Sequence, residues 1–200
     1  MKDKFVVTIG REFGSGGGEI GRRLSTYFNI PCYDKELLTL VAKESGYCKE
    51  YFEKYDEKPL KVLSYFGYDT NVSTLPINHQ LFLKQFNLIQ KLASEKSCIF
   101  VGRAADYALK DFDNVLNVFI HGEFEFRRKR AIKEHGIEEE KSASIVKKID
   151  KERSSYYKYY TDTSCGYAEN YHICLDTSFI GIDESVKIII DFIMIYFRKC

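Results

Sequence analysis

The chain has 200 residues, of which 44% are hydrophobic and 30% charged, and its formal net charge is +1. Such a composition is ordinary for a globular protein and excludes a fibrous or disordered chain. The near-neutral charge excludes a general electrostatic attraction to nucleic acid or to anionic membranes. We therefore expect one domain over residues 1–200, which can bury roughly 70% of the surface that the unfolded chain exposes.

Two features of the chain predict a cytoplasmic protein without a membrane partner. Its first residues contain only a short apolar run, which does not fit a signal peptide, and its most apolar stretch, 186–197, is too short to span a bilayer. The six cysteines form no C-x-x-C pair. Because neither zinc ligation nor a disulfide framework fits this spacing, we interpret them as reduced thiols and expect no metal-ligating residues among them.

Strand and helix patterns alternate along the chain. Short apolar runs predict strands at 5–9, 30–34, 98–101, 115–120 and 173–176. Helical spacing of apolar residues predicts helices at 19–28, 35–45, 79–95, 123–135, 142–160 and 183–198. This alternation predicts an α/β fold with a mostly parallel sheet covered on both faces. Residues 46–76, where aromatic and charged residues interleave, are expected to form an insert of short helices outside the sheet.

The loop between the first strand and the first helix is rich in glycine: Gly14, Ser15, Gly16, Gly17 and Gly18. Glycine has no Cβ and accepts positive φ, so several backbone N–H groups can turn toward one phosphate. The N-terminus of the following helix also favours an anion. A flexible connection is the alternative, but the position between strand and helix favours phosphate binding.

Two phosphate-binding designs compete for this loop. Gly16, Gly18 and Gly21 satisfy G-x-G-x-x-G, and Asp34 lies about 16 residues after Gly18, near the place of a ribose-binding acid in a dinucleotide fold. However, six residues separate Ile9 from Gly16, whereas a dinucleotide-binding turn follows its strand almost at once. The longer loop favours a P-loop, although the lysine of G-x-x-x-x-G-K-[ST] is missing.

Six segments follow one another along the chain: T-I-G-R-E-F-G-S-G-G-G-E-I-G (8–21), P-C-Y-D-K-E-L (31–37), V-G-R-A-A-D-Y-A-L (101–109), the basic helix at 123–130, D-K-E-R (150–153) and L-D-T-S (175–178). In this order they resemble the cytidylate kinase-like family, a divergent relative of bacterial cytidylate kinases. The resemblance implies a three-layer α/β/α P-loop fold with an acceptor-binding insert at 46–76 and a helical lid at about 123–160. It also implies ATP-dependent phosphoryl transfer to a nucleoside monophosphate, CMP or dCMP, with ATP and Mg²⁺ as cofactors.

The resemblance assigns the nucleotide's phosphates to the glycine loop. Gly14, Gly16 and Gly18 fall on the family's glycines, and Gly17 takes the lysine's position. Glu19 takes the position of a following threonine, which leaves Ser15 as the only hydroxyl within the loop.

The missing lysine would normally neutralise phosphate charge. We hypothesise that Arg11 supplies this cation, because a guanidinium can bind two phosphate oxygens at once. A solvated surface arginine is the alternative for Arg11. Glu12 is expected to be a structural partner of Arg11.

The resemblance assigns the acceptor side to Asp34, Arg103 and Asp106. Gly102-Arg103 looks like the pair whose arginine grips the acceptor monophosphate, and the carboxyl edge of a parallel sheet is where ligands bind. Asp106 would pair with Arg103 or face the base. Asp34 would contact magnesium-bound water or the acceptor ribose, or would cap the helix at 35–45.

The lid region contributes further arginines. Arg127 and Arg130 share a helix face by their spacing, and the resemblance places such arginines on the transferring phosphoryl group, although a solvated face is the usual account of a charge run. Arg153 matches an acceptor-side arginine, with Asp150 as its orienting partner. The predicted catalytic residues are thus Arg11, Arg127, Arg130 and Arg153, and no general base is needed because the acceptor phosphate is already a nucleophile.

Two other functions remain open from the sequence. The missing lysine is also compatible with a nucleotide-binding regulatory protein that has little or no kinase activity. A dinucleotide-dependent enzyme rests only on G-x-G-x-x-G. The tyrosines at 156, 157, 159 and 160 could stack on a base, but a packed stripe along their helix is favoured. The expected partners are a donor nucleotide and an acceptor monophosphate, and no nucleic acid polymer.

Overall fold

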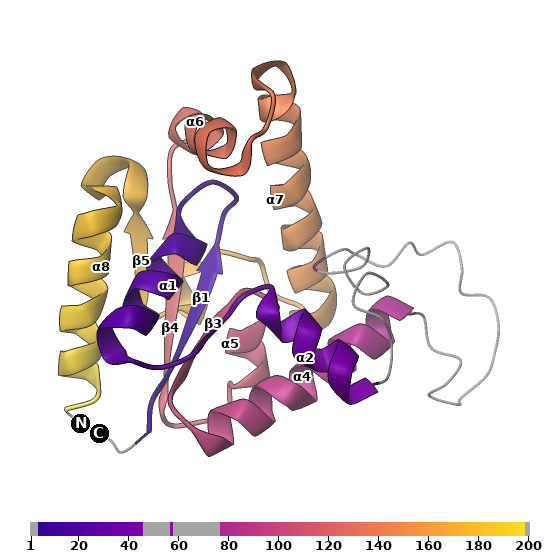
Figure 1. Cartoon of the computed structure of the whole chain (residues 1–200), viewed down its shortest axis with the longest axis vertical. Helices are drawn as coiled ribbons and strands as arrows, with labels where there is room; N and C mark the ends of the chain where they lie inside the picture. The colour runs from indigo at the N-terminus through magenta and orange to yellow at the C-terminus, as the bar shows by residue number, and fades with distance from the viewer. Residues whose placement is uncertain (1–3, 46–56, 58–76, 199–200) are drawn as a thin grey trace.

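The structure is a computed structural model that describes residues 4–45, 57 and 77–198. Its centre is a five-stranded sheet in the order β2-β3-β1-β4-β5, in which every neighbouring pair of strands is parallel (Figure 1). The strands are β1 (Val6–Arg11), β2 (Cys32–Tyr33), β3 (Cys98–Val101), β4 (Val115–His121) and β5 (Ile173–Asp176). The predicted parallel sheet is confirmed, and all strand carboxyl ends therefore meet at one edge.

One face of the sheet is covered by α1 (Gly17–Phe28) and α8 (Thr177–Tyr196), which lie on the same side in Figure 1. Ile20 and Leu24 of α1 and Ile189 and Ile193 of α8 are completely buried in a cluster with Val7 and other alternate residues of the strands. This alternation follows from the two-residue repeat of a strand, which sends successive side chains to opposite faces.

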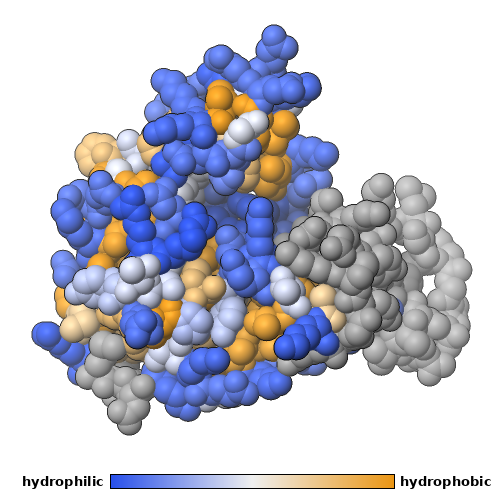
Figure 2. All heavy atoms as spheres, viewed as in Figure 1, coloured by the Kyte–Doolittle hydropathy of each residue, from blue (hydrophilic) through white to orange (hydrophobic). Residues whose placement is uncertain are grey.

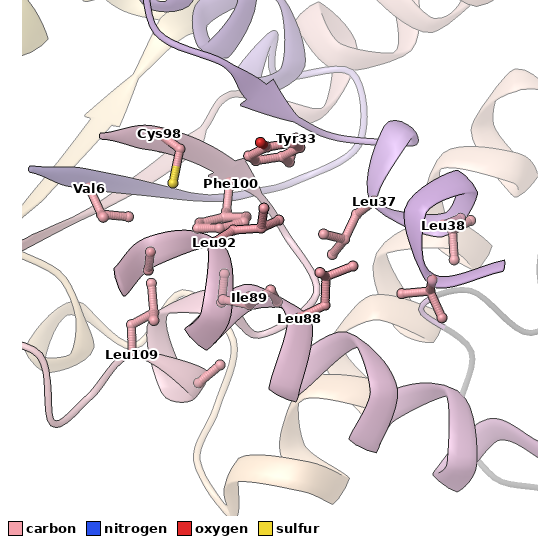
Figure 3. Close-up of a cluster of buried hydrophobic side chains, with 14 of the residues drawn as sticks. Val6, Tyr33, Leu37, Leu38, Leu88, Ile89, Leu92, Cys98, Phe100 and Leu109 are labelled. Atoms are coloured by element: carbon pink, nitrogen blue, oxygen red, sulfur yellow. The ribbon is translucent and has the colours of Figure 1, made fainter. Parts of the chain in front are cut away.

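The opposite face is covered by α2 (Glu36–Ser45), α4 (Ile77–Glu95) and α5 (Ala105–Ala108). Figure 3 shows their apolar side chains, among them Leu37, Leu88 and Ile89, gathered beneath the strands. Tyr33 of β2 and Phe100 of β3 stack there, with ring centroids 5.4 Å apart. The two covered faces confirm the three-layer α/β/α fold.

Of the remaining helices, α6 (Phe124–His135) lies beyond the carboxyl edge of the sheet, above the glycine loop in Figure 1. Helix α7 (Glu139–Thr161) begins beside α6 and runs down on the right of the loop. A short 3-10 helix, Ala168–Asn170, leads into β5. Tyr156 and Tyr157 of α7 are buried, and Tyr160 stacks on Phe82 of α4 with ring centroids 3.7 Å apart. These three tyrosines form the packed stripe that the sequence favoured.

One helix begins earlier than predicted and one short helix was not predicted, each for a local reason. Helix α8 begins at Thr177 and not at residue 183, because the Asp176 side chain accepts a hydrogen bond from the Ser178 N–H and so caps an earlier turn. Gly181, with φ of 77°, interrupts that helix and obscured its start in the sequence. The four-residue helix α5 was not predicted, since it is too short to show a repeat.

The predicted insert at 46–76 lies outside the described residues except for Glu57. None of the helices in the described part of the chain is long and apolar enough to cross a membrane.

Candidate functional site

A cleft of about 270 Å³ opens at the carboxyl edge of the sheet, between the glycine loop and helices α6 and α7. In Figure 2 this face, above the start of α1, is mostly hydrophilic. Ten of the thirteen predicted site residues line the cleft: Arg11, Gly14, Gly16, Gly17, Gly18, Glu19, Asp34, Arg103, Arg130 and Arg153. The parallel sheet explains this convergence, because it brings the ends of β1, β2 and β3 to one place. Ser15, Asp106 and Arg127 do not line the cleft.

Two glycines in the loop are required by its backbone. Gly14 and Gly16 have φ of 78° and 93°, in the left-handed region that glycine tolerates best. A Cβ on Gly14 would lie 2.4 Å from the Arg127 carbonyl oxygen, and one on Gly16 would lie 2.2 Å from Ile182. Helix α1 begins at the next residue, so its free N–H groups face the loop. This is the backbone that phosphate binding needs.

Ser15 is turned away from the cleft. Its side chain is completely buried, and its hydroxyl donates to the Glu12 carbonyl oxygen at 2.8 Å. Its own carbonyl oxygen accepts from the Thr177 hydroxyl at 2.7 Å, which ties the loop to the start of α8. Ser15 therefore holds the shape of the loop in this structure.

The Arg11 side chain covers the position of the missing lysine. A Cβ on Gly17 would lie only 2.7 Å from the Arg11 Cβ, which is closer than two such carbons approach. The Arg11 side chain is 9% exposed, so the alternative of a solvated surface arginine is wrong. Glycine at position 17 thus leaves the space that the Arg11 side chain uses.

The Arg11 guanidinium reaches a carboxylate that the sequence did not single out. Its Nη1 and Nη2 donate to Glu57 Oε1 and Oε2 at 2.6 and 3.0 Å. Arg153 Nε donates to the same Oε2 at 3.2 Å, and the Arg103 backbone N–H donates to Oε1 at 2.9 Å. Burial alone would raise the pKa of Glu57, but the charges of Arg11 and Arg153 hold that pKa well below its usual range.

The backbone after β3 is strained beside this carboxylate. Gly102, Arg103 and Ala104 have φ of 76°, 58° and 50°. For the two residues with a side chain, this conformation costs about 1–2 kcal/mol each. A Cβ on Gly102 would lie 1.8 Å from Arg11 Nη1 and 2.3 Å from Glu57 Oε1. Strain of this kind gathers at binding and catalytic sites, and here it turns the Arg103 N–H into the cleft.

Asp34 and Arg103 lie together beside the glycine loop. Asp34 Oδ1 is 3.6 Å from Arg103 Nη1, and a Cβ on Gly18 would lie 3.2 Å from Asp34 Oδ2. Arg103 is 3% exposed and donates from Nη1 to the Val101 carbonyl oxygen at 3.1 Å. The two side chains therefore link the end of β2 to the end of β3 in the floor of the cleft.

The two arginines predicted as a lid pair have different surroundings. Arg130 Nη2 is 2.7 Å from Glu19 Oε2 and lines the cleft. Arg127 is 6% exposed, and its Nε lies 3.0 Å from Glu12 Oε2 while its Nη1 lies 2.6 Å from Asp150 Oδ2. Arg127 also donates to the carbonyl oxygens of Phe13 and Gly122. It joins the glycine loop to α6 and α7.

These contacts correct two expected pairings. Glu12 was expected to be a partner of Arg11, but its carboxylate binds Arg127 and accepts from the Gly122 N–H at 3.1 Å. Asp150 was expected to orient Arg153, but it binds Arg127 and accepts from the Phe13 N–H at 2.7 Å. Spacing in the sequence favoured ion pairs between residues close together in the chain, whereas in the fold both carboxylates bind an arginine from another element.

Asp106 lies behind the cleft, in a small adjoining cavity of about 30 Å³. Its Oδ2 accepts from the Tyr157 hydroxyl at 2.6 Å, and burial raises the pKa of its carboxyl group. The bond joins α5 to α7. This position supports the walls of the cleft, and contact of Asp106 with a base stays a prediction.

The cleft has the donors that a nucleotide needs. Loop N–H groups and arginines suit phosphate oxygens, and the carboxylates of Glu19 and Asp34 offer the oxygen ligands that Mg²⁺ prefers. The described residues contain no group of three or more histidine, cysteine or acidic side chains placed to hold a metal by themselves. A metal here would therefore need oxygens from a bound phosphate, as is usual for Mg²⁺.

Comparisons with known proteins agree with this geometry. A crystal structure of an uncharacterized protein from Eubacterium ventriosum ATCC 27560 is similar at 29% identity and a TM-score of 0.72, covering 95% of this chain and 98% of that one. Shikimate kinase from Acinetobacter baumannii in complex with shikimate is similar at 14% identity and a TM-score of 0.55, covering 96% and 94%. Shikimate kinase from Aquifex aeolicus is similar at 19% identity and a TM-score of 0.51, covering 93% and 94%.

At these identities the two shikimate kinases show the fold, which is that of P-loop kinases. The sheet order also differs from the 3-2-1-4-5-6 order of the dinucleotide fold, which removes that interpretation of the glycines. No curated protein matches the chain. The model of the cytidylate kinase-like family matches residues 6–179, and the chain therefore belongs to the cytidylate kinase-like family.

Proposed function

We propose that the chain catalyses ATP-dependent phosphoryl transfer to a nucleoside monophosphate, with CMP and dCMP as the first acceptors to test. The observation that carries this proposal is the arrangement of Arg11, whose side chain crosses the lysine position at Gly17 and ends in the cleft beside the glycine loop. This arrangement supports a role for the Arg11 guanidinium as the cation that the standard motif takes from its lysine.

On the donor side, the phosphates of ATP would bind the N–H groups of the glycine loop and of the N-terminus of α1. Arg11 would lie between the donor and acceptor phosphates and neutralise charge on both, and Arg130 of α6 would neutralise the donor phosphates from the other side. Glu19, which now binds Arg130, would exchange that contact for the nucleotide or for its magnesium ion. Arg127 would position the loop without touching the nucleotide, because its guanidinium already binds two carboxylates and two carbonyl oxygens.

On the acceptor side, the monophosphate would bind Arg103 and Arg153, and Asp34 would hold the Arg103 side chain in place. The acceptor phosphate carries its own negative charge, so these residues would act by placing it in line with the donor and by screening repulsion between the two phosphates. Magnesium, when bound with the nucleotide, would supply further charge neutralisation.

The test is a coupled assay with ATP, Mg²⁺ and a panel of acceptors that contains the common nucleoside monophosphates and shikimate. We expect turnover with CMP or dCMP. Arg11→Ala should lower kcat/KM by about 10²–10³-fold, the loss typical for removal of one charge-stabilising donor. Arg128→Ala is the matched control, because Arg128 lies on α6 but pairs with Glu125 outside the cleft.

A second function is favoured by one observation. The loop lacks the lysine, and its Ser15 hydroxyl donates to the Glu12 carbonyl oxygen, so that in this structure the hydroxyl is turned away from the cleft in which a nucleotide's magnesium ion would bind. Tight ATP binding without turnover of any acceptor would therefore replace the kinase proposal with a nucleotide-binding regulatory role. Turnover of shikimate in preference to the monophosphates would keep the kinase and change its acceptor. Full activity of Arg11→Ala would disprove the role of Arg11.

A further inference from the structure

The Glu57 carboxylate is bound as a ligand would be. Each of its two oxygens accepts two hydrogen bonds: Oε1 from Arg11 Nη1 and the Arg103 N–H, and Oε2 from Arg11 Nη2 and Arg153 Nε. All four donors come from residues that line the cleft. Guanidinium groups and a turned-in backbone N–H are the groups that proteins use to bind phosphate oxygens.

Among the described residues, the single negative charge of Glu57 does not by itself neutralise the arginines around it. Three guanidinium groups, those of Arg11, Arg103 and Arg153, face the carboxylates of Glu57 and Asp34. Burial lowers the pKa of the Arg153 guanidinium and the charge of Arg11 lowers it further, whereas the carboxylates of Glu57, Asp150 and Asp34 act in the opposite direction. A phosphate monoester carries about −1.5 to −2 at neutral pH and has three terminal oxygens, so it would complement these donors better than one carboxylate does.

Gly102 lets a carboxylate and a guanidinium approach the backbone closely at this place. Because Gly102 has no side chain, Glu57 Oε1 and Arg11 Nη1 can approach its Cα, where a Cβ would lie 2.3 and 1.8 Å from them. The site is continuous with the cleft of about 270 Å³ that also contains the glycine loop. A phosphoryl group bound here would therefore lie within the same cleft as a nucleotide on the loop.

We propose that the Glu57 carboxylate occupies the place of a ligand's phosphoryl group, so that a phosphate monoester binds to Arg11, Arg103 and Arg153 by displacing it. Glu57 is then an internal competitor that weakens the binding of small phosphates. A ligand with a second set of contacts, such as a nucleoside, would overcome this competition. Naming the acceptor monophosphate as that ligand rests on the proposed function, whereas competition between Glu57 and phosphate does not.

The experiment compares phosphate binding by the full chain and by Glu57→Gln, without ATP and at constant ionic strength. Isothermal titration calorimetry with inorganic phosphate and with CMP should show both ligands binding about tenfold tighter to Glu57→Gln, as expected if the unblocked site is populated about one-tenth of the time in the wild type. Phosphate should also raise the melting temperature of Glu57→Gln more than that of the wild type. Glu125→Gln is the matched control, because it removes the same charge from an arginine pair outside the cleft.

Equal or weaker phosphate binding by Glu57→Gln would overturn the proposal and make Glu57 a fixed support for the arginines. If Glu57→Gln does not fold, Glu57→Asp carries the test, because it keeps the charge and withdraws the carboxylate by one methylene. It should also bind phosphate more tightly than the wild type, and weaker binding would count against the proposal. If the chain has no kinase activity but Glu57→Gln binds phosphate more tightly than the wild type, the proposed function fails and this inference holds. If the chain is a kinase but Glu57→Gln does not bind phosphate more tightly, this inference fails and the proposed function holds.

Discussion

At the scale of single residues, the main finding is the close contact between positions 11 and 17. A P-loop lysine would begin at Gly17, but the Arg11 side chain lies over that position and needs the space that glycine leaves. Arginine and lysine are not equivalent here, since a guanidinium binds two oxygens in a fixed plane and an ammonium acts as a point charge. The two positions should therefore depend on each other.

Restoring the lysine should harm the protein unless Arg11 is also removed. We expect Gly17→Lys to lower the melting temperature and ATP affinity, because its Cβ would lie 2.7 Å from the Arg11 Cβ. Combined with Arg11→Gly, the same lysine should be tolerated, with a coupling energy of about 0.5–3 kcal/mol in a double-mutant cycle. Thermal unfolding and ATP titration of the four proteins measure it. Strictly additive effects would show that the two positions are independent.

At the scale of elements, polar contacts fix helix α7 to the rest of the molecule on two sides. Asp150 of α7 binds Arg127 of α6 and the Phe13 N–H of the glycine loop. Near the other end of α7, Tyr157 donates to Asp106 of α5, directly after the Arg103 turn. The position of Arg153 between these contacts is thus set from both sides. Loss of either contact should loosen the arginines of the cleft.

The contact between α5 and α7 gives a pH-dependent prediction. Burial raises the pKa of Asp106, so its stabilising contribution is full below the ordinary aspartate pKa of about 3.9 and falls as pH rises through the higher folded value. Tyr157→Phe removes a donor to the carboxylate and should raise that pKa further. We expect a loss of about 1–3 kcal/mol at neutral pH and a smaller loss near pH 4.

Urea denaturation at the two pH values checks this prediction. Tyr159→Phe is the control, because Tyr159 lies on the same helix and is 54% exposed. A loss of the same size at both pH values would mean that ionisation of Asp106 is not involved.

At the scale of the whole molecule, the sheet connects two separate hydrophobic clusters. Val6 and Phe100 face α2, α4 and α5, whereas their neighbours Val7 and Ile99 face α1 and α8. The same strands end at the cleft, so packing on either face bears on the positions of the glycine loop and of Arg103. We infer that the two clusters and the cleft form one cooperative unit.

This cooperativity can be tested with one substitution on each face. Ile89→Ala and Ile193→Ala remove side chains that are completely buried on opposite faces, and each should cost about 2–5 kcal/mol. Both should shift one single transition, seen alike by circular dichroism and tyrosine fluorescence. Ile195→Ala, at a position 55% exposed, should change the free energy of unfolding by no more than about 0.5 kcal/mol. Two separate transitions would contradict a single unit.

Local sequence patterns were sufficient for the strands and longer helices of the described part of the chain, and for much of the cleft. Apolar runs located each strand in the described residues, and the glycines of the loop between β1 and α1 marked that loop. Gly102-Arg103 and Asp34 could be placed in the cleft because the carboxyl ends of parallel strands share an edge. These inferences need only the two-residue and 3.6-residue repeats and the rules of parallel sheets.

Side-chain partners were not predictable in the same way. Glu57 stands among many other charged residues in the sequence, and no repeat distinguishes it. Arg127 and Arg130 looked alike by spacing, yet one is buried between the glycine loop and α7 and the other lines the cleft. Spacing along a helix fixes which residues share its face, but packing against other elements decides what each of them meets.

The sequence by itself determined the parallel α/β fold, the glycine loop between β1 and α1 and the absence of a P-loop lysine there. Only the tertiary structure decided what lies at the lysine's position, since the Arg11 side chain crosses Gly17 and meets Glu57, Arg103 and Arg153 at the sheet edge. The physical reason is the range of the interactions. Backbone conformation follows from neighbours within a few residues, whereas Glu57 contacts groups 46 and 96 residues away along the chain.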